Sequence, residues 1–184
     1  VKVLLEKFVE ENVDGVILDL RNNGGGGLDE AINMAGLFIG LNPVVIVRQS
    51  GGRRVTVHRS RERAVYTGPL VIMLNRYSAS ASEILAGAMH DFQRALLVGD
   101  TTTFGKGTVQ NIFQLPEGYG ALKVTIAQFY RVSGWSTQNR GVETSIVLPS
   151  LNNAREIGES TLDNALPWRS IDQVSYRPKE IGRA

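Results

Sequence analysis

The sequence predicts an α/β fold with a mostly parallel β-sheet, built as one domain of stacked strand–helix units. Short apolar runs typical of buried strands alternate with segments whose apolar residues recur at helical spacing. The 184 residues fit one ordinary domain, and 42% of them are hydrophobic. No apolar run approaches the length of about 18 residues that a membrane-spanning helix requires.

The first strand–helix unit follows an N-terminal helix. Apolar side chains within residues 2–13 recur at helical spacing, and residues 16–20 form a short apolar run expected to be a buried strand. Four consecutive glycines, residues 24–27, then lead into a helical pattern from Leu28 to about Phe38. This order of strand, glycine loop and helix is typical of parallel α/β folds.

The rest of the chain supplies more strands and a second long helix. A helix of small and apolar residues is expected over residues 78–92. From residue 151 the pattern weakens to one amphipathic piece around 157–166, so we expect a core over residues 1–150 and a C-terminal tail over residues 151–184 that packs on it. The remaining expected strands are residues 44–48, 55–59, 70–74, 95–98, 108–113 and 122–131.

Composition and charge exclude several classes of site. Lys and Arg number 20 and Asp and Glu 18, a formal charge of +2 that attracts no polyanion strongly. The densest basic stretch, residues 53–63, is interpreted as an exposed hairpin, so no nucleic-acid partner is expected. The chain has no cysteine, which excludes disulfides, thiolate zinc sites and cysteine nucleophiles.

Two glycine-containing stretches look like nucleotide-binding loops but fail in detail. After the first strand, the third glycine of the dinucleotide fingerprint is replaced by Asp29 or Glu30, which would repel a pyrophosphate. Residues 99–108 have the wrong glycine spacing for a phosphate-binding loop, and a glycine follows Lys106. The run at residues 24–27 is either a tight turn or a set of N–H donors for a developing oxyanion.

A serine and a lysine are the candidates for nucleophilic catalysis. His90 lies about 15 Å along the predicted helix from Ser80, so a Ser-His-Asp triad is not expected. Ser80 has capping-box spacing with Glu83, and is either the N-cap alone or a nucleophile among the free N–H groups of the helix start. Lys106 lies between two glycines, and is either a solvent-facing turn residue or a buried amine that acts as a base.

The chain resembles the tail-specific, or carboxy-terminal processing, serine proteases in ordered segments. Residues 19–26, Asp-Leu-Arg-Asn-Asn-Gly-Gly-Gly, are similar to the family's strand and glycine loop, and residues 78–84, Ser-Ala-Ser-Ala-Ser-Glu-Ile, to its nucleophile segment. Residues 103–110 resemble its lysine segment, and residues 129–138 the strand that follows. Residues 162–168 resemble the tail of the long, periplasmic branch.

This resemblance implies a crotonase-like fold and a Ser-Lys dyad, with Ser80 as nucleophile, Lys106 as general base and Gln110 positioning the lysine. The even offsets of Lys106, Thr108 and Gln110 predict one shared strand face. Four residues of ideal strand span about 13 Å. A contact between lysine and glutamine therefore requires converging side chains or a kink at Gly107.

The resemblance also implies acyl transfer without a metal or a cofactor. The oxyanion hole is expected to combine the N–H of Ala81 with one from the glycine loop, Gly26 first and Gly25 as the alternative. Neutral lysine takes the serine proton, and water then clears the acyl-enzyme. A serine endopeptidase that processes or degrades proteins from or near their C-termini is the implied function.

The implied partners are polypeptide substrates, with a PDZ domain upstream and a location in the bacterial periplasm or cell envelope. Nothing here is PDZ-like, and the chain begins on a helix, so we expect a catalytic-core fragment without the PDZ domain and leading strand, and whether it is active alone stays open. The alternatives are a non-catalytic peptide-binding scaffold and a small-molecule acyl hydrolase. The presence of both Ser80 and Lys106 favours the protease.

Overall fold

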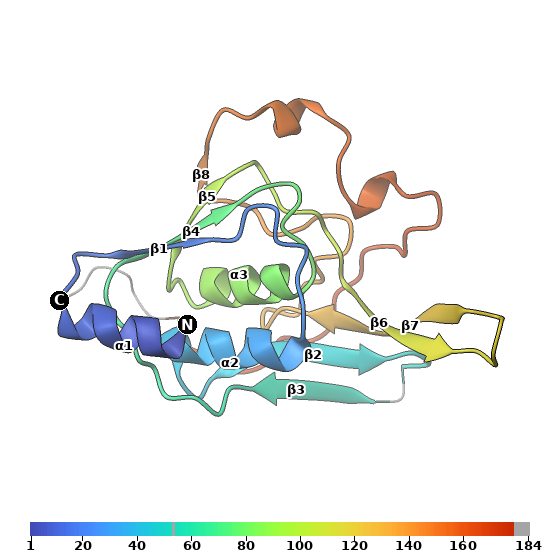
Figure 1. Ribbon diagram of the computed structural model, residues 1–184, viewed down its shortest axis with the longest axis horizontal. Coiled ribbons are helices and arrows are strands. Elements are labelled where there is room, and N and C mark those ends of the chain that lie inside the picture. Colours follow the sequence, from blue (N-terminus) through green and yellow to red (C-terminus); the bar gives the residue numbers. More distant parts are fainter. Residues whose placement is uncertain (53, 179–184) are drawn as a thin grey trace.

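The computed structural model describes residues 1–52 and 54–178. The described residues form two four-stranded sheets with helices between them (Figure 1). Helices α2 (Leu28–Ile39) and α3 (Ala81–Asp91) pack on each other, and both contact the second sheet. Helix α1 (Lys2–Glu10) lies at the periphery beside α2 (Figure 1).

The first sheet is entirely parallel. Its strand order is β1-β4-β5-β8, with every neighbouring pair parallel and Val16 of β1 opposite Leu70 of β4. The predicted α/β fold with a parallel sheet is therefore confirmed. The strands are β1 Val16–Asp19, β4 Leu70–Leu74, β5 Leu96–Gly99 and β8 Ile146–Val147.

The second sheet is entirely antiparallel, in the order β3-β2-β7-β6. A hairpin with Gly51 and Gly52 in its turn joins β2 to β3. Strands β6 and β7 form a longer hairpin that projects from the body (Figure 1). The sequence did not predict that these strands form a sheet of their own. They are β2 Pro43–Gln49, β3 Val55–Arg59, β6 Thr108–Gln114 and β7 Ala121–Tyr130.

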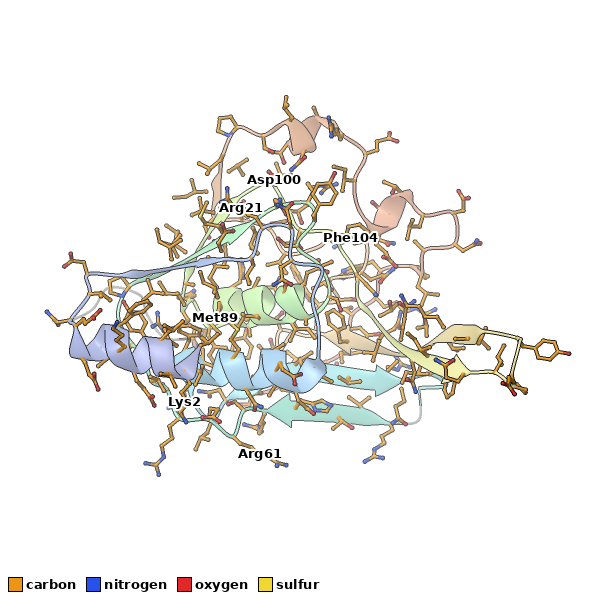
Figure 2. The ribbon with its side chains drawn as sticks, viewed as in Figure 1. Lys2, Arg21, Arg61, Met89, Asp100 and Phe104 are labelled. Atoms are coloured by element: carbon orange, nitrogen blue, oxygen red, sulfur yellow. The ribbon has the colours of Figure 1, made fainter. Side chains whose placement is uncertain are left out.

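Helix α3 is buried around nearly its whole circumference because it lies between the two sheets. Its small residues suit that position: a Cβ on Gly87 would lie 3.2 Å from the Arg131 side chain. Met89, in the middle of the molecule in Figure 2, is fully buried. The sheets thus hold α3 from both sides and fix its N-terminus, which carries Ser80 as N-cap.

The C-terminal segment packs along residues 131–136, which follow β7. Trp168 Nε1 donates to the Ser136 carbonyl at 2.9 Å, and Tyr176 packs edge-on against Phe92. The amphipathic piece expected around residues 157–166 contains one short 3₁₀ helix, η2 (Glu159–Thr161). A second 3₁₀ helix, η1 (Leu151–Ala154), precedes it. Across residues 1–52 and 54–178, no helix has the length and apolar character needed to cross a membrane.

Candidate active site

The glycine loop and the serine turn meet because they follow neighbouring parallel strands. Strand β1 leads into the loop and β4 into the turn, so both leave the sheet at the same edge. The carbonyl of Asn23 accepts the Ala79 N–H and the Ser82 hydroxyl, both at 3.0 Å. The Asn22 N–H donates to Asn75 Oδ1 at 2.9 Å. These bonds fix the loop against the start of α3.

Among the three serines of the turn, Ser80 differs from its neighbours. The Ser78 hydroxyl donates to the Leu20 carbonyl at 2.8 Å and the Ser82 hydroxyl bonds the loop, so both are buried structural groups. Ser80 is partly exposed and has φ 57° and ψ −115°, a strained conformation for a residue with a side chain. A strained turn between strand and helix is the position from which nucleophilic serines are presented.

Backbone donors lie on either side of this serine. A Cβ on Gly25 would lie 2.8 Å from the Ala81 nitrogen and 2.9 Å from Ser80 Cβ, so Gly25 touches the turn. Its own N–H donates to Asn23 Oδ1 at 2.9 Å. Within the described residues, the N–H groups of Gly26 and Ala81 have no hydrogen-bond partner. Among the described residues the N–H groups of Gly24 and Gly27 also lack a partner, so the loop offers more than one candidate donor beside Ala81.

A buried carboxylate joins the serine turn to the lysine segment. Glu83 Oε2 accepts the N–H groups of Ser80 at 2.8 Å and Lys106 at 2.9 Å. Its Oε1 accepts the Thr103 hydroxyl at 2.6 Å and the Gly105 N–H at 2.7 Å. Sequence analysis treated Glu83 only as a capping residue; the box is present, but the same side chain also holds the second segment.

Burial and hydrogen bonding act on Glu83 in opposite directions. The side chain is fully buried, and this desolvation raises its pKa from an ordinary 4.5 to about 7. The four donors favour the ionised form and hold the pKa below the value that burial alone would produce. The carboxylate therefore changes charge near neutral pH while it connects both halves of the site.

Lys106 and Gln110 contact each other, although they do not share a regular strand face with Thr108. Lys106 Nζ donates to Gln110 Oε1 at 3.0 Å. The predicted common face is wrong because a β-bulge follows Val109: Thr108 lies opposite Gln128, whereas Gln110 lies opposite Thr125. Lys106 itself precedes β6, so its side chain reaches the glutamine without spanning an ideal strand.

The lysine segment is held near the serine turn through its backbone. The Phe104 N–H donates to the Ser78 carbonyl at 3.0 Å, and the Gly107 N–H donates to Gln138 Oε1 at 2.9 Å. Lys106 is partly buried. Among the hydrogen bonds of the described residues, none joins the Ser80 hydroxyl to Lys106 Nζ; the amine is bonded to Gln110 instead.

Gln138 is a further supporting residue that sequence analysis missed. It is fully buried, and its N–H also donates to Ser136 Oγ at 3.0 Å. A Cβ on Gly107 would lie 2.8 Å from the Gln138 nitrogen, so the two segments touch closely. Nothing in the local sequence marks a lone glutamine as buried, because the contact depends on segments 31 residues apart.

The histidines lie away from Ser80, as expected. His90 ends α3 and bonds Arg131, and His58 lies on β3. In the part of the chain that the structure describes, no three His, Asp or Glu side chains are grouped as metal ligands. The groups gathered at the start of α3 are a serine, a lysine, amides and one carboxylate.

A small pocket opens beside the serine turn. Its volume is about 150 Å³, and its wall includes Gly26, Gly27 and Ala81, whose N–H groups have no hydrogen-bond partner among the described residues. The apolar part of the wall comes from Leu20, Met34 and Leu85. A small apolar group can enter it next to the backbone donors.

Residues 1–148 match the family described as peptidase family S41. The chain belongs to peptidase family S41. The tail-specific protease of Haemophilus influenzae is 47% identical over 99% of this chain, which covers 27% of that protein. The carboxyl-terminal-processing protease of Synechocystis sp. is 44% identical over 68% of this chain and 29% of that protein.

Two solved structures are similar to the chain in fold. A photosystem II D1 C-terminal processing protease superposes with a TM-score of 0.71 and 33% identity, over 80% of this chain and 38% of that one. Mature CPAF is 18% identical with a TM-score of 0.62, which supports the fold alone. The chain thus spans less than a third of the two curated relatives' length. The predicted resemblance is confirmed.

Proposed function

We propose that this chain carries the catalytic core of a serine endopeptidase that cleaves polypeptides through a Ser80 acyl-enzyme, with Lys106 as general base. The Glu83 carboxylate is the observation that carries the proposal. It accepts the N–H groups of both Ser80 and Lys106, so one buried group sets nucleophile and base relative to each other. Membership of peptidase family S41 supports the same reaction class.

The proposed reaction begins when the free amine of Lys106 takes the Ser80 proton as the serine oxygen attacks the scissile carbonyl carbon. The N–H groups of Ala81 and Gly26 stabilise the resulting oxyanion. The lysine then protonates the leaving amine, and water, deprotonated by Lys106, hydrolyses the ester. Gln110 Oε1 accepts a hydrogen bond from Lys106 and orients it. Binding of substrate brings the amine within hydrogen-bond reach of Ser80.

The pocket of about 150 Å³ beside Ser80 is proposed to take the side chain that precedes the scissile bond. Because Met34 and Leu85 line it and its volume is small, it favours alanine- or valine-sized apolar side chains over charged or aromatic ones. This preference concerns only the residue before the scissile bond, so it does not depend on the length of the peptide.

For the whole protein we propose polypeptide substrates cleaved at or near their C-termini, as the names of the relatives say of those proteins. A PDZ domain upstream and a location in the bacterial periplasm or cell envelope complete the proposal. Within the chain, we propose that residues 1–150 are the crotonase-like core and residues 151–184 the tail that packs on it, of which residues 179–184 lie outside the described part of the chain.

The test is cleavage of an unstructured protein with an apolar C-terminus, by the chain and its Ser80→Ala and Lys106→Ala variants, between about pH 6 and 10. Each substitution is expected to reduce kcat/KM by at least about 10³-fold. Lys123→Ala removes an exposed lysine from β7 and is the matched control, expected to retain full activity.

A fluorophosphonate probe provides a second readout, because it labels activated serines without requiring protein substrate. Peptide mapping is expected to find the label on Ser80 in the chain and in Lys123→Ala, and none in Lys106→Ala. Cleavage and labelling that persist in Ser80→Ala would contradict the proposal. A folded chain that neither cleaves nor labels, even with its upstream region restored, would favour a peptide-binding scaffold.

A further inference from the structure

Strand β6 is an open edge of the second sheet. In the order β3-β2-β7-β6 it pairs with β7 alone among the described strands. Its last five residues, 110–114, are all exposed. The main-chain groups on the outer side of such a strand are free to pair with another strand. This edge therefore needs either protection or a partner.

The sequence of β6 gives this edge little protection. Edge strands are usually protected by charged residues, by proline or by a bulge. Strand β3, the other edge of the sheet, carries Arg59 and directly follows Arg54. Strand β6 reads Thr-Val-Gln-Asn-Ile-Phe-Gln, with no charged residue, proline or glycine. The β-bulge lies before Gln110, so residues 110–114 continue as regular strand. A segment of this composition pairs readily between chains.

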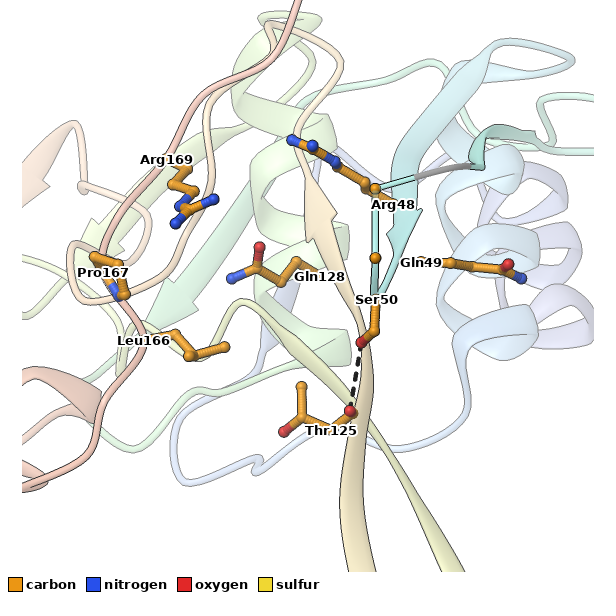
Figure 3. A pocket seen from close by; sticks show the side chains of 10 residues that line it. Arg48, Gln49, Ser50, Thr125, Gln128, Leu166, Pro167 and Arg169 are labelled. Carbon is orange, nitrogen blue, oxygen red and sulfur yellow. Dashed lines mark hydrogen bonds between the residues drawn. The ribbon is translucent and has the colours of Figure 1, made fainter.

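The outer part of the β6–β7 hairpin lacks a third strand. The β2–β7 ladder ends at the pair Gln49 and Ala127. Just beyond it, the Ser50 hydroxyl donates to the Thr125 carbonyl at 3.5 Å (Figure 3). From Thr125 to Ala121, β7 pairs with β6 alone among the described strands. Because two strands by themselves are marginally stable in water, this part of the hairpin would gain from further strands.

The same part of the hairpin exposes large apolar side chains. Phe113 and Leu122, which are register partners, are 47% and 51% exposed. Ile112 is 59% exposed, and Tyr119 at the tip is 78% exposed. A two-stranded arm cannot cover these side chains by itself, whereas a wider sheet can.

The alternation of main-chain groups shows which residues of β6 face outward. The Leu115 N–H donates to a carbonyl of the opposite arm at 2.9 Å, so Leu115 faces β7. Since the groups of successive residues point to opposite sides of a strand, those of Gln110, Ile112 and Gln114 point away from β7. The Ile112 N–H agrees with this, because it bonds the neighbouring Asn111 Oδ1 at 2.9 Å and not β7.

We propose that β6 pairs antiparallel with β6 of a second copy of this chain, about a two-fold axis at Ile112. In this register Ile112 faces Ile112 of the second copy, and Gln110 faces Gln114 of the second copy. All three outward residues then gain main-chain partners. Because β6 carries no charge, the two copies do not repel each other along the shared edge. The interface is self-complementary, as a two-fold dimer requires.

The hairpin favours a second copy over a single extended polypeptide. A second hairpin contributes two strands, so the outer part becomes a four-stranded sheet. In the same register Leu115, which is 41% exposed, lies opposite Val109 of the second copy, which packs against the core. The outer edges of the joined sheet are then the two β3 strands, whose arginines oppose further growth. The inference does not depend on the reaction at Ser80.

The first test is sedimentation velocity of the chain over a range of protein concentrations. The chain is expected to change from monomer to dimer as the concentration rises, without larger species. Ile112→Lys places two like charges face to face at the two-fold axis and is expected to weaken dimerisation by about tenfold or more. Val55→Lys adds the same charge to the other edge strand, at a position that is also exposed, and is the matched control, expected to dimerise like the unchanged chain.

Cysteine cross-linking tests the register, because the chain has no cysteine of its own. Ile112→Cys is expected to form a disulfide-linked dimer under mild oxidation. Facing Cα atoms of a hydrogen-bonded antiparallel pair are about 5.5 Å apart, which a disulfide can span. Tyr119→Cys lies at the exposed hairpin tip and is expected not to cross-link, because the two tips point in opposite directions.

The proposal is overturned if the chain stays monomeric at every concentration, or if Ile112→Lys dimerises like Val55→Lys. Cross-linking of Tyr119→Cys but not of Ile112→Cys also overturns it, because the copies would then meet tip to tip. A monomeric Ser80→Ala chain that binds an unstructured polypeptide, and loses this binding with Ile112→Lys, would show that the edge takes a polypeptide instead. Circular dichroism checks that each variant is folded.

Discussion

Glu83→Gln is expected to change how the stability of the chain depends on pH. Burial raises the pKa of Glu83 to about 7 in the folded chain, against 4.5 for the exposed group. The folded state therefore keeps this proton to higher pH than the unfolded state, and stability from Glu83 is lost as pH rises from about 4.5 through 7. At about 1.4 kcal/mol per pH unit, the loss is about 3 kcal/mol.

The quantity to measure is the free energy of unfolding of the chain minus that of Glu83→Gln, from urea titrations between about pH 4.5 and 8. Fluorescence of Trp135 and Trp168 reports unfolding. Because glutamine does not titrate, the difference is expected to fall by about 3 kcal/mol across this range. Glu117→Gln, at an exposed position of the β6–β7 hairpin, controls for the loss of one carboxylate. A difference that stays constant, or rises with pH, would refute the account of Glu83.

Three other substitutions test the site and its support. Gly25→Ala would place a Cβ 2.7 Å from a backbone carbonyl oxygen at a φ of 100°, so urea titration should show a loss of about 1–3 kcal/mol in the free energy of unfolding. A Cβ on Gly26 meets no atom within 4 Å, so the control Gly26→Ala should leave the free energy of unfolding unchanged. Gln110→Ala removes the acceptor of the Lys106 amine, the proposed base, and should lower kcat about tenfold with KM unchanged. A change in KM alone would contradict its proposed positioning role. Asp91→Asn leaves partly buried Arg131 without its charged partner and should cost about 3 kcal/mol of unfolding free energy, and an unchanged urea midpoint would contradict this.

The elements could be predicted closely from sequence because their signals are local. The apolar run at residues 70–74 is β4 without a change of boundary, and the helix expected from Leu28 to Phe38 ends at Ile39. The grouping of strands into two sheets could not be predicted in the same way. It depends on β2 pairing with β7, about 80 residues later, and no local pattern specifies that partner.

In the candidate site, too, features with local sequence signals could be predicted, and features that depend on distant segments could not. The Ser80–Lys106 pair was predicted from the ordered motifs and the loop donors from the glycine run, and both stay predictions. The bulge after Val109 was missed because it depends on cross-strand register rather than on β6 alone. The role of Glu83 was underestimated because its capping spacing is local, whereas its bonds to Thr103, Gly105 and Lys106 reach residues 20 to 23 positions away.

The shared carboxylate also has a kinetic consequence. The amide protons of Ser80, Gly105 and Lys106 all point to one side chain, so none of them becomes accessible to solvent exchange unless Glu83 releases it. Their exchange rates should therefore move together when the protein is perturbed. The serine turn and the lysine segment form one cooperative opening unit, so the site is either assembled as a whole or lost as a whole.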